Sequence, residues 1–252
     1  MHEKAAKGYQ SAADAYERGR PEYPREAVGF LLERLLFKTG QTIVDIGAGT
    51  GKLTKLLRLS GANVVAVEPV EAMRKKFSAV LPEIEILDGR SEAIPLPDGC
   101  VDGAIVATAF HWFDGRKSLA EIHRILKPSG MLGLIWNVRD ESSDSVAKLT
   151  SIIDPFEGNT PRYRNMEWKK VFQETKLFSS LELKQFYHAH SGTHDMVVDR
   201  VASISFIAAL PEKQRQLVLE EVRSLLESHP QTKGMSRMDI PYRTDVFWCG
   251  RI

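Results

Sequence analysis

Between residues 41 and 140, short apolar runs alternate with segments of helical pattern, and this alternation limits the possible folds more than any other feature of the chain. The apolar runs occupy residues 42–47, 63–69, 84–89, 101–110 and 131–138, and the helical patterns occupy 51–61, 70–82 and 117–130. Runs that are almost entirely apolar are typical of strands buried on both faces. Their alternation with helices therefore predicts an α/β fold built on a parallel sheet.

The flanking segments have a different organisation. Residues 26–37 have the pattern of a leading helix, and after residue 140 the alternation stops. The remaining patterns predict helices at 144–153, 165–176, 194–210 and 213–229 and strands at 181–190 and 240–252. Because no repeat or low-complexity stretch marks a boundary, we expect one domain over 1–252. Residues 1–40 would form an N-terminal lid and the leading helix, 41–140 a ligand-binding core, and 141–252 substrate-cover helices and closing strands.

Composition narrows the class of protein. The chain has 252 residues, 43% of them hydrophobic and 27% charged, with a formal net charge of +1. This balance predicts a globular protein without a global field for nucleic acid or an anionic membrane. The two cysteines suggest neither a disulfide framework nor a zinc site. The N-terminus lacks the apolar core of a signal peptide, so we expect a cytoplasmic protein. We also expect it to be a monomer or a homodimer.

Three glycines, Gly47, Gly49 and Gly51, follow the first apolar run directly. One glycine would be explained by a tight turn alone, but three spaced two apart allow a ligand to approach the backbone and the helical amides that follow. The spacing is G-x-G-x-G, whereas the dinucleotide fingerprint is G-x-G-x-x-G, and no phosphate-binding G-x-x-x-x-G-K-[ST] stands here. The spacing thus disfavours a pyrophosphate ligand.

Carboxylates end the first three predicted strands, with Asp45, Glu68 and Asp88 at those positions. The carboxyl ends of parallel strands meet at one edge of a sheet, where open α/β sheets bind ligands. Asp45 suits a ligand with positive charge, Glu68 can accept hydrogen bonds from two ribose hydroxyls, and Asp88 can accept one from an adenine amino group. The pattern predicts a site for a positively charged, adenosine-containing ligand.

Four stretches together resemble the class I S-adenosylmethionine-dependent methyltransferases of the small-molecule branch called type 11. They are VDIGAGTG (44–51), VVAVEP (64–69), LDGRSEAIPLPDGCVD (87–102) and LKPSG (126–130). AYERGRPEYP (15–24) and HWFD (111–114) resemble the trans-aconitate methyltransferase-like subgroup. The resemblance implies a Rossmann-like, seven-stranded, mostly parallel sheet with an antiparallel last strand, helices on both faces and helical substrate-cover additions. It also implies S-adenosyl-L-methionine as cofactor, which makes 41–140 the cofactor-binding core.

The resemblance assigns residues to parts of the ligand. The three glycines would line its methionine part, Asp45 would lie near its amino group, Glu68 would hold the ribose and Asp88 the adenine. The full expected cofactor set is Tyr16, Arg20, Asp45, Gly47, Ala48, Gly49, Gly51, Glu68, Pro69, Met73, Asp88, Ala107, Thr108 and Phe110. The expected substrate set is Tyr23, His111, Trp112 and Trp136.

Methyl transfer is a displacement at carbon, so the protein must mainly align the acceptor and exclude water. A base helps a hydroxyl or amine acceptor, and His111 is the candidate; alternatively, it is a structural or cofactor-contacting histidine beside Trp112. Arg20 could bind a carboxylate of cofactor or substrate within a lid over the cofactor, whereas Pro21 and Pro24 could simply stiffen a connection.

His188 and His190 would share one strand face, but no acid or cysteine lies nearby at ligand spacing, so we expect no metal. Three classes of function compete. The favoured class is a methyltransferase for a small molecule with a carboxylate, hydroxyl or thiol acceptor. The second is a non-catalytic S-adenosylmethionine-binding regulator or scaffold. The third, a nicotinamide oxidoreductase, is disfavoured by the glycine spacing and Asp45.

Overall fold

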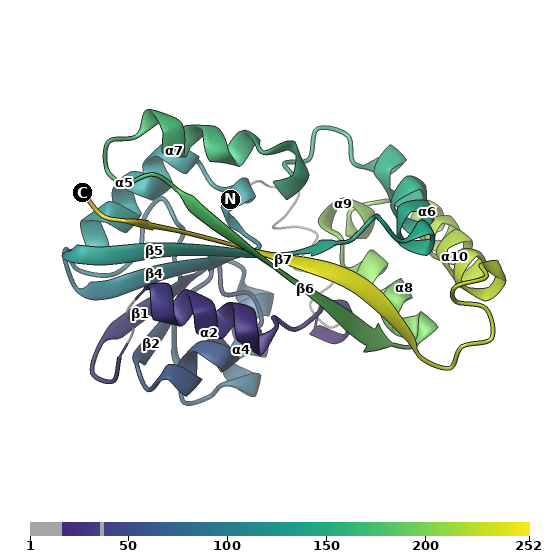
Figure 1. Cartoon of the computed structure of the whole chain (residues 1–252), viewed down its shortest axis with the longest axis horizontal. Helices are drawn as coiled ribbons and strands as arrows, with labels where there is room; N and C mark the ends of the chain where they lie inside the picture. The colour runs from purple at the N-terminus through teal and green to yellow at the C-terminus, as the bar shows by residue number, and fades with distance from the viewer. Residues whose placement is uncertain (1–16, 36–37) are drawn as a thin grey trace.

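A computed structural model describes residues 17–35 and 38–252 (Figure 1). Its strands are β1 (Thr42–Ile46), β2 (Asn63–Val67), β3 (Glu85–Leu87), β4 (Val101–Ala107), β5 (Leu126–Arg139), β6 (Glu182–Gly192) and β7 (Met238–Gly250). Its α-helices are α2 (Arg25–Arg34), α3 (Thr54–Leu57), α4 (Glu71–Val80), α5 (Gly115–Ile125), α6 (Asp144–Ile153), α7 (Lys170–Glu174), α8 (His194–Ala202), α9 (Ser205–Ala208) and α10 (Glu212–Ser228). Short 3₁₀ helices are η1 (Arg58–Ser60), η2 (Phe110–Trp112), η3 (Asp154–Phe156), η4 (Tyr163–Asn165) and η5 (Glu167–Lys169).

All seven strands form one sheet in the order β3-β2-β1-β4-β5-β7-β6. β7 pairs antiparallel with both β5 and β6, and the other pairings are parallel. The strand order changes direction between β1 and β4, where the chain leaves one half of the sheet and begins the other. The predicted seven-stranded, mostly parallel sheet with an antiparallel last strand is confirmed.

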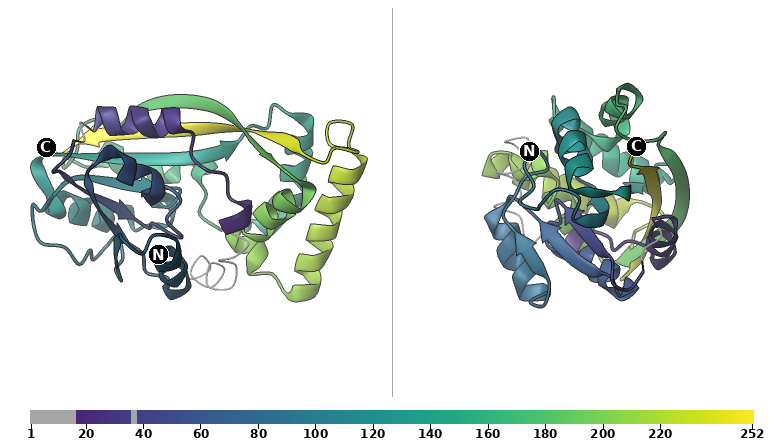
Figure 2. Two further views of the ribbon diagram at one scale, coloured as in Figure 1. Left: turned by 90° about the horizontal axis from the view of Figure 1, so that it is seen from below. Right: turned by 90° about the vertical axis from the view of Figure 1, so that its left-hand side faces the viewer.

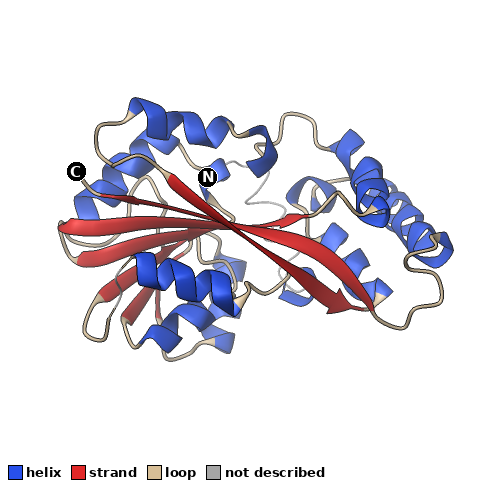
Figure 3. Cartoon of the chain, viewed as in Figure 1, coloured by secondary structure: helices blue, strands red, loops and turns tan. Residues whose placement is uncertain are grey.

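Helices cover both faces of the sheet (Figure 3). Along each central strand, alternate side chains enter different hydrophobic clusters. Val44, Val106 and Leu134 pack in the cluster that includes α5 and α7, whereas Ile105 and Ile135 pack in the cluster that includes α2 and α3. Burial on both faces explains why these strands are apolar at nearly every position.

The outer strands extend beyond the core of the sheet. β7 pairs with β5 only as far as Tyr242, while its pairing with β6 continues to Met238 opposite Gly192. The extension is a two-stranded ribbon, and α6, α8, α9 and α10 lie at its far end (Figures 1 and 2). These helices share a separate hydrophobic cluster with Ile240 and Tyr242 of the ribbon. We call this group of helices the cover.

Several helices differ in extent from the prediction. The helix expected at 117–130 ends at Ile125, because proline cannot continue a helix and Pro128 instead lies within β5. The run expected at 194–210 divides into α8 and α9 around the extended backbone of Ile204. The segment at 165–176 forms η5 and α7 and packs on the sheet through Trp168 and Phe172, so it is not part of the cover.

The close packing around Gly51, in the turn that follows β1, can be tested by substitution. Its φ is +90°, and a Cβ there would lie 2.7 Å from Leu81 Cδ1 and 2.9 Å from Phe77 Cδ2. Gly99 also has positive φ, +57°, but a Cβ there would meet nothing within 4 Å. We expect Gly99→Ala to cost about 1 kcal/mol from backbone strain alone and Gly51→Ala about 2–4 kcal/mol, measured by denaturant unfolding. Equal losses would show that α4 adapts to the extra methyl group.

Candidate functional site

Three adjoining clefts lie at the carboxyl ends of β1, β2 and β4. The glycine cleft, about 590 Å³, is lined by Gly47, Gly49, Glu68, Pro69, Met73, Gly89, Arg90, Ser91, Glu92, Ala107, Thr108, Ala109, Trp112 and Phe113. The middle cleft, about 460 Å³, is lined by Arg20, Pro21, Tyr23, Gly47, Ala48, Thr50, Lys52, Leu53, Ala107, Thr108, Asn137 and Arg200. The arginine cleft, about 810 Å³, is lined by Arg20, Thr108, His111, Trp112, Trp136, Asn137, Val138, Arg139, Glu141, Arg162, Tyr163, Arg164, Arg200, Ile204, Ser205 and Phe206.

The glycine turn after β1 forms one end of the glycine cleft. Gly47 and Gly49 have φ of +73° and +59°, which favours glycine. A Cβ on Gly47 would lie 3.0 Å from the Cβ of Ala109, so a side chain there would fill the space beside the turn. Gly51 does not line the clefts, because it faces α4. The first two glycines open space for a ligand, and the third permits close packing.

Glu68 lies in the wall of the glycine cleft and is only 4% exposed. Its Oε2 accepts a hydrogen bond from the Gly49 amide at 3.0 Å, and its Oε1 accepts one from the Val70 amide at 2.8 Å. Burial raises the pKa of Glu68 to about 7, although both amides act in the opposite direction. The carboxylate is therefore held in one position, and each oxygen keeps a second lone pair for a ligand.

Asp45 lies beneath the glycine turn and is fully buried. Thr54 Oγ1 donates to its Oδ2 at 2.6 Å, whereas its Oδ1 has no hydrogen-bond partner among the described residues. Burial raises the pKa of Asp45 to about 6, and its charge contributes to the raised pKa of Glu68. Two carboxylates that disfavour each other's ionisation fit a ligand that brings positive charge or hydroxyl donors.

Besides Gly51 and the buried Asp45, two further residues of the predicted cofactor set, Asp88 and Phe110, lie outside the lining of the clefts. The Asp88 side chain is 71% exposed and pairs with Arg74 Nη2 at 2.9 Å, because β3 ends at Leu87 and the following residues cross the strand edge. Phe110 is 1% exposed and packs in the core against Phe172, with ring centroids 5.1 Å apart. The turn at Thr108 directs the chain into η2 and places Phe110 beneath the site.

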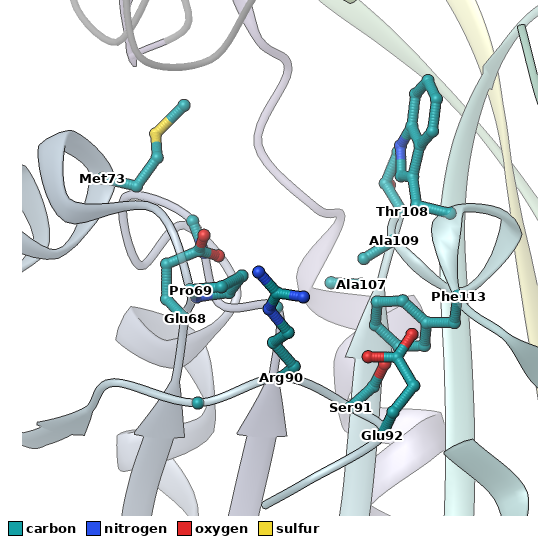
Figure 4. A pocket seen from close by; sticks show the side chains of 14 residues that line it. Glu68, Pro69, Met73, Arg90, Ser91, Glu92, Ala107, Thr108, Ala109 and Phe113 are labelled. Atoms are coloured by element: carbon teal, nitrogen blue, oxygen red, sulfur yellow. The ribbon is translucent and has the colours of Figure 1, made fainter. Parts of the chain in front are cut away.

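Residues that the sequence interpretation missed line the cleft instead. Figure 4 shows Glu68, Pro69 and Met73 on one wall, with Ala107, Ala109 and Phe113 on the opposite wall and the Arg90 side chain between them. The new residues of this wall and floor are Gly89, Arg90, Ser91, Glu92, Ala109 and Phe113. Gly89, directly after Asp88, was the available signal: a Cβ there would lie 2.5 Å from Pro95 Cδ, so the tight turn needs glycine.

The segment before α2 connects the sheet to the cover. Lys52 Nζ lies 3.2 Å from Glu22 Oε1, and Asn137 Nδ2 donates to the Glu22 carbonyl at 3.1 Å. At its other side, a Cβ on Gly19 would lie 2.3 Å from the backbone nitrogen of Arg200 in α8. Arg20 and Tyr23 of this segment line the middle cleft, whereas Tyr16 lies outside the described residues.

Thr108 is shared by all three clefts. It has a φ of +51°, uncommon for a β-branched residue, and its amide donates to the Ile135 carbonyl at 2.8 Å. Its Oγ1 lies 2.7 Å from the hydroxyl of Tyr23. Backbone strain of this kind is found at functional sites. Thr108 thus lies where the three clefts adjoin, with the hydroxyl of Tyr23 beside it in the middle cleft.

His111 lies in the arginine cleft with its protonation defined by Trp136. Trp136 Nε1 is 3.3 Å from His111 Nδ1, and an indole N–H can only donate. Nδ1 therefore accepts, and the proton of the neutral ring is on Nε2. Burial, together with the charges of Arg162 and Arg20, lowers the pKa of His111 to about 3. This arrangement disfavours the predicted general base and makes Nε2–H a hydrogen-bond donor.

Of the other predicted substrate residues, Trp112 and Trp136 line the same cleft, whereas Tyr23 lines the middle cleft. Trp112 contributes to both the glycine cleft and the arginine cleft. Trp136 is 1% exposed and belongs mainly to the core, with its ring centroid 4.5 Å from that of Trp168. Within residues 17–35 and 38–252, no three His, Cys, Asp or Glu side chains are grouped as metal ligands would be. None of the helices in the same ranges is both long enough and apolar enough to span a membrane.

Comparisons with known proteins place the chain in a family. Residues 44–134 match the family model described as a methyltransferase domain. An uncharacterized methyltransferase of Mycobacterium bovis is 38% identical over 236 residues, which cover 94% of this chain and 92% of that protein. An uncharacterized methyltransferase-like protein of Schizosaccharomyces pombe is 30% identical over 96% of this chain and 94% of its own length. The chain belongs to the class I S-adenosylmethionine-dependent methyltransferases.

Solved structures share the fold of this methyltransferase. A type II methyltransferase structure from Anaeromyxobacter dehalogenans has a TM-score of 0.69 at 23% identity and covers 92% of this chain and 97% of that one. Geranyl diphosphate C-methyltransferase from Streptomyces coelicolor, solved with S-adenosyl-L-homocysteine, has a TM-score of 0.52 at 16% identity, with coverage of 90% and 76%. At these identities the likeness concerns the fold alone.

The protonation of His111 can be observed directly. We expect nitrogen-15 NMR of the methyltransferase to show Nε2 protonated and Nδ1 unprotonated from about pH 5 to about pH 8, where an unperturbed histidine would titrate. Trp136→Phe removes the donor to Nδ1 and should change the Nδ1 shift, with the rest of the spectrum as the control for folding. A titration midpoint for His111 inside this pH range would contradict the assignment.

Proposed function

We propose that this methyltransferase transfers a methyl group to a small-molecule acceptor bound in the arginine cleft, with S-adenosylmethionine in the glycine cleft. The observation that carries the proposal is the position of Thr108, which lines both clefts at the end of β4. Displacement at carbon needs donor and acceptor in line and shielded from water. Two clefts that share Thr108 and Trp112 suit that requirement, and the formal charge of +1 supports a small molecule rather than nucleic acid.

The residues of the glycine cleft fit the cofactor. Bound S-adenosylmethionine supplies a methyl group already activated on its sulfonium. Glu68, fixed by two backbone amides, would accept the ribose hydroxyls, and the space beside Gly47 would take the methionine part. The unpartnered Oδ1 of Asp45 supports a role near the amino group, through the turn above it. Residues 89–92 would flank the adenine in place of the side chain of Asp88.

Two further parts of the proposal concern organisation. The segment at 17–24 would act as a lid, because it contacts Lys52 beside the glycine turn and α8 of the cover. The cover would enclose the acceptor as part of one methyltransferase domain, of the small-molecule branch that residues 15–24 and 111–114 resemble. A non-catalytic regulator would need the glycine cleft alone. The adjoining arginine cleft of about 810 Å³ favours an enzyme.

Cofactor binding can be tested by calorimetric titration. We expect micromolar binding of S-adenosylmethionine and S-adenosylhomocysteine and none of NAD. Glu68→Ala should weaken binding of S-adenosylhomocysteine by about tenfold or more, because two hydrogen bonds to a charged acceptor are lost. Glu71→Ala, a matched change at an exposed glutamate of α4 that pairs with Lys75, should leave affinity unchanged. NAD binding alone, or equal effects of the two variants in folded protein, would refute the site.

Proton release gives an independent test of the two carboxylates. Hydroxyl donors and a cationic ligand favour ionised Glu68 and Asp45, so binding should lower their pKa values from about 7 and about 6. Bound protein then holds fewer protons near pH 7, and affinity for S-adenosylhomocysteine should rise as pH rises through this range. Titration in buffers of different ionisation enthalpy should detect proton release. Asp45→Asn should reduce the release, and an unchanged value would remove Asp45 from the coupled pair.

A further inference from the structure

The face of the sheet that α2 covers changes from apolar to polar near the start of α2. Ile135 of β5 and Val246 of β7 share the hydrophobic cluster of α2. Two residues away along each strand, and therefore on the same face, stand Asn137 and Thr244, which are directly opposite each other in the pairing of the two strands. The lid segment, residues 17–24, passes this polar pair on its way from α2 to the cover (Figure 2). The pair therefore supports the lid segment rather than the helix.

Hydrogen bonds fix the orientation of the Asn137 side chain. Its Nδ2 lies 3.1 Å from the carbonyl oxygen of Glu22 and 3.4 Å from that of Pro21. Carbonyl oxygens only accept, so the amide nitrogen must face the lid segment. Its Oδ1 then faces Thr244, whose Oγ1 lies 2.6 Å away and must donate. Because Thr244 is fully buried, the amide of Asn137 is held from the interior of the protein.

His188 of β6 completes this support. Its Nδ1 is 3.3 Å from Thr244 Oγ1. A hydroxyl has one proton, and that of Thr244 is donated to Asn137, so His188 Nδ1 carries a proton and donates to Thr244. His188 Nε2 is then unprotonated; it is buried and has no hydrogen-bond partner in the described part of the chain. Burial holds the pKa of His188 below its ordinary value, so the ring is neutral near pH 7.

The bond to Asn137 sets the register of the lid segment. The two carbonyls that Asn137 binds lie between Arg20 and Tyr23, and both of these residues line the middle cleft together with the glycine turn. The hydroxyl of Tyr23 reaches Thr108 Oγ1 at 2.7 Å, where the three clefts adjoin. Since prolines stand on both sides of residues 22–23 and limit rotation of the backbone, a displacement at Asn137 would also move Tyr23.

Two ion pairs also join the lid segment to its neighbours, but both are exposed. Lys52 Nζ lies 3.2 Å from Glu22 Oε1, and Arg18 Nε lies 2.7 Å from Asp199 Oδ2. The side chains of Glu22 and Arg18 are 55% and 61% exposed. Water and salt screen such pairs, so they stabilise a structure little. Thr244, by contrast, is shielded from both, which makes its bond to Asn137 the firmer hold.

We propose that Asn137, oriented by Thr244 and His188, is a positioning residue of this methyltransferase. It holds the lid segment against the glycine turn and so controls the passage of the cofactor into and out of the glycine cleft. The inference rests on the proposed function and extends the site to residues of β6 and β7. Asn137 acts through the lid segment and is assigned no bond to cofactor or acceptor. A weaker hold would let the lid open more often, which would speed both entry and exit.

The test follows S-adenosylhomocysteine by stopped-flow fluorescence with the full chain. Tryptophan emission is the signal, since Trp112 lines the glycine cleft. Asn137→Ala removes both hydrogen bonds to the lid segment. We expect S-adenosylhomocysteine to dissociate about tenfold faster from this variant, and to associate no more slowly than with the unaltered protein. Damage to the glycine cleft itself would instead slow association.

Variants of Thr244 test the support of Asn137 from below. Thr244→Val keeps the shape but removes the donor to Asn137, so dissociation should be about fivefold faster. Thr244→Ser keeps the hydroxyl and should restore dissociation to within about twofold of the original rate. Thr150→Val is the matched control, at a buried threonine of α6 whose hydroxyl has no partner among the described residues. It should change neither rate.

Limited digestion with trypsin reports on the lid segment without any ligand. Trypsin can cleave after Arg18, whereas the bond after Arg20 precedes a proline and resists cleavage. Cleavage requires local opening, so its rate follows the population of open lid. The fragment that begins at residue 19, identified by mass spectrometry, should form about fivefold faster in Thr244→Val than in Thr244→Ser. Thr150→Val should match the unaltered protein.

The possible failures are distinguishable. If the folded protein binds no S-adenosylhomocysteine, the proposed function itself fails. If S-adenosylhomocysteine binds but leaves Asn137→Ala and Thr244→Val at the original rate, the inference about the lid fails alone. Faster dissociation joined to slower association would likewise overturn it, because the glycine cleft would then be altered. Thr244→Ser that dissociates as fast as Thr244→Val would show that the hydroxyl of Thr244 does not support the lid.

Discussion

The carboxylate of Glu68 connects the parts of the cofactor half of the site. Its two oxygens accept from the amides of Gly49 and Val70, so the turn after β1 and the entry to α4 are bound to the same group. Buried in this position, the group is costly to ionise, and Asp45 beneath the turn increases the cost. Two buried acids that disfavour each other's ionisation lower the stability of the fold, and such pairs are found at functional sites. The relief comes from a ligand that brings donors and positive charge.

Across Thr108 the electrostatics are reversed. The glycine cleft has buried carboxylates in or beneath its wall, whereas five arginines line the arginine cleft. A cationic methyl donor would be attracted to the side of the buried carboxylates. Thr108, which adjoins all three clefts and lies directly after β4, has a strained backbone and is in hydrogen-bond contact with Tyr23.

The sequence predicted the sheet well because burial on both faces leaves an apolar run for each central strand, as at 42–46 and 101–107. Of the cofactor residues that it proposed at strand ends, Glu68, Gly47 and Gly49 line the glycine cleft. Asp88 does not, because β3 has only three residues and ends at Leu87, and the Asp88 side chain after it is exposed. Of the arginines that line the arginine cleft, the sequence interpretation named Arg20 alone, since Arg139, Arg162 and Arg200 lie far apart in the chain and no local pattern connects them. His111 was found, but its role depends on a hydrogen bond from Trp136, twenty-five residues away.

The two-stranded ribbon, formed by the end of β6 and the start of β7, separates the cover from the rest of the sheet. The helices of the cover pack with Ile240 and Tyr242 in a hydrophobic cluster distinct from those of the sheet. Substitutions inside this cluster can alter the volume and shape of the arginine cleft while the glycine turn keeps its geometry. Each pair of residues added to the ribbon, one in each strand, would move the cover by about 3.3 Å. A different acceptor could therefore be accommodated by a change in ribbon length or in the packing of the cover. The glycine cleft would not have to change.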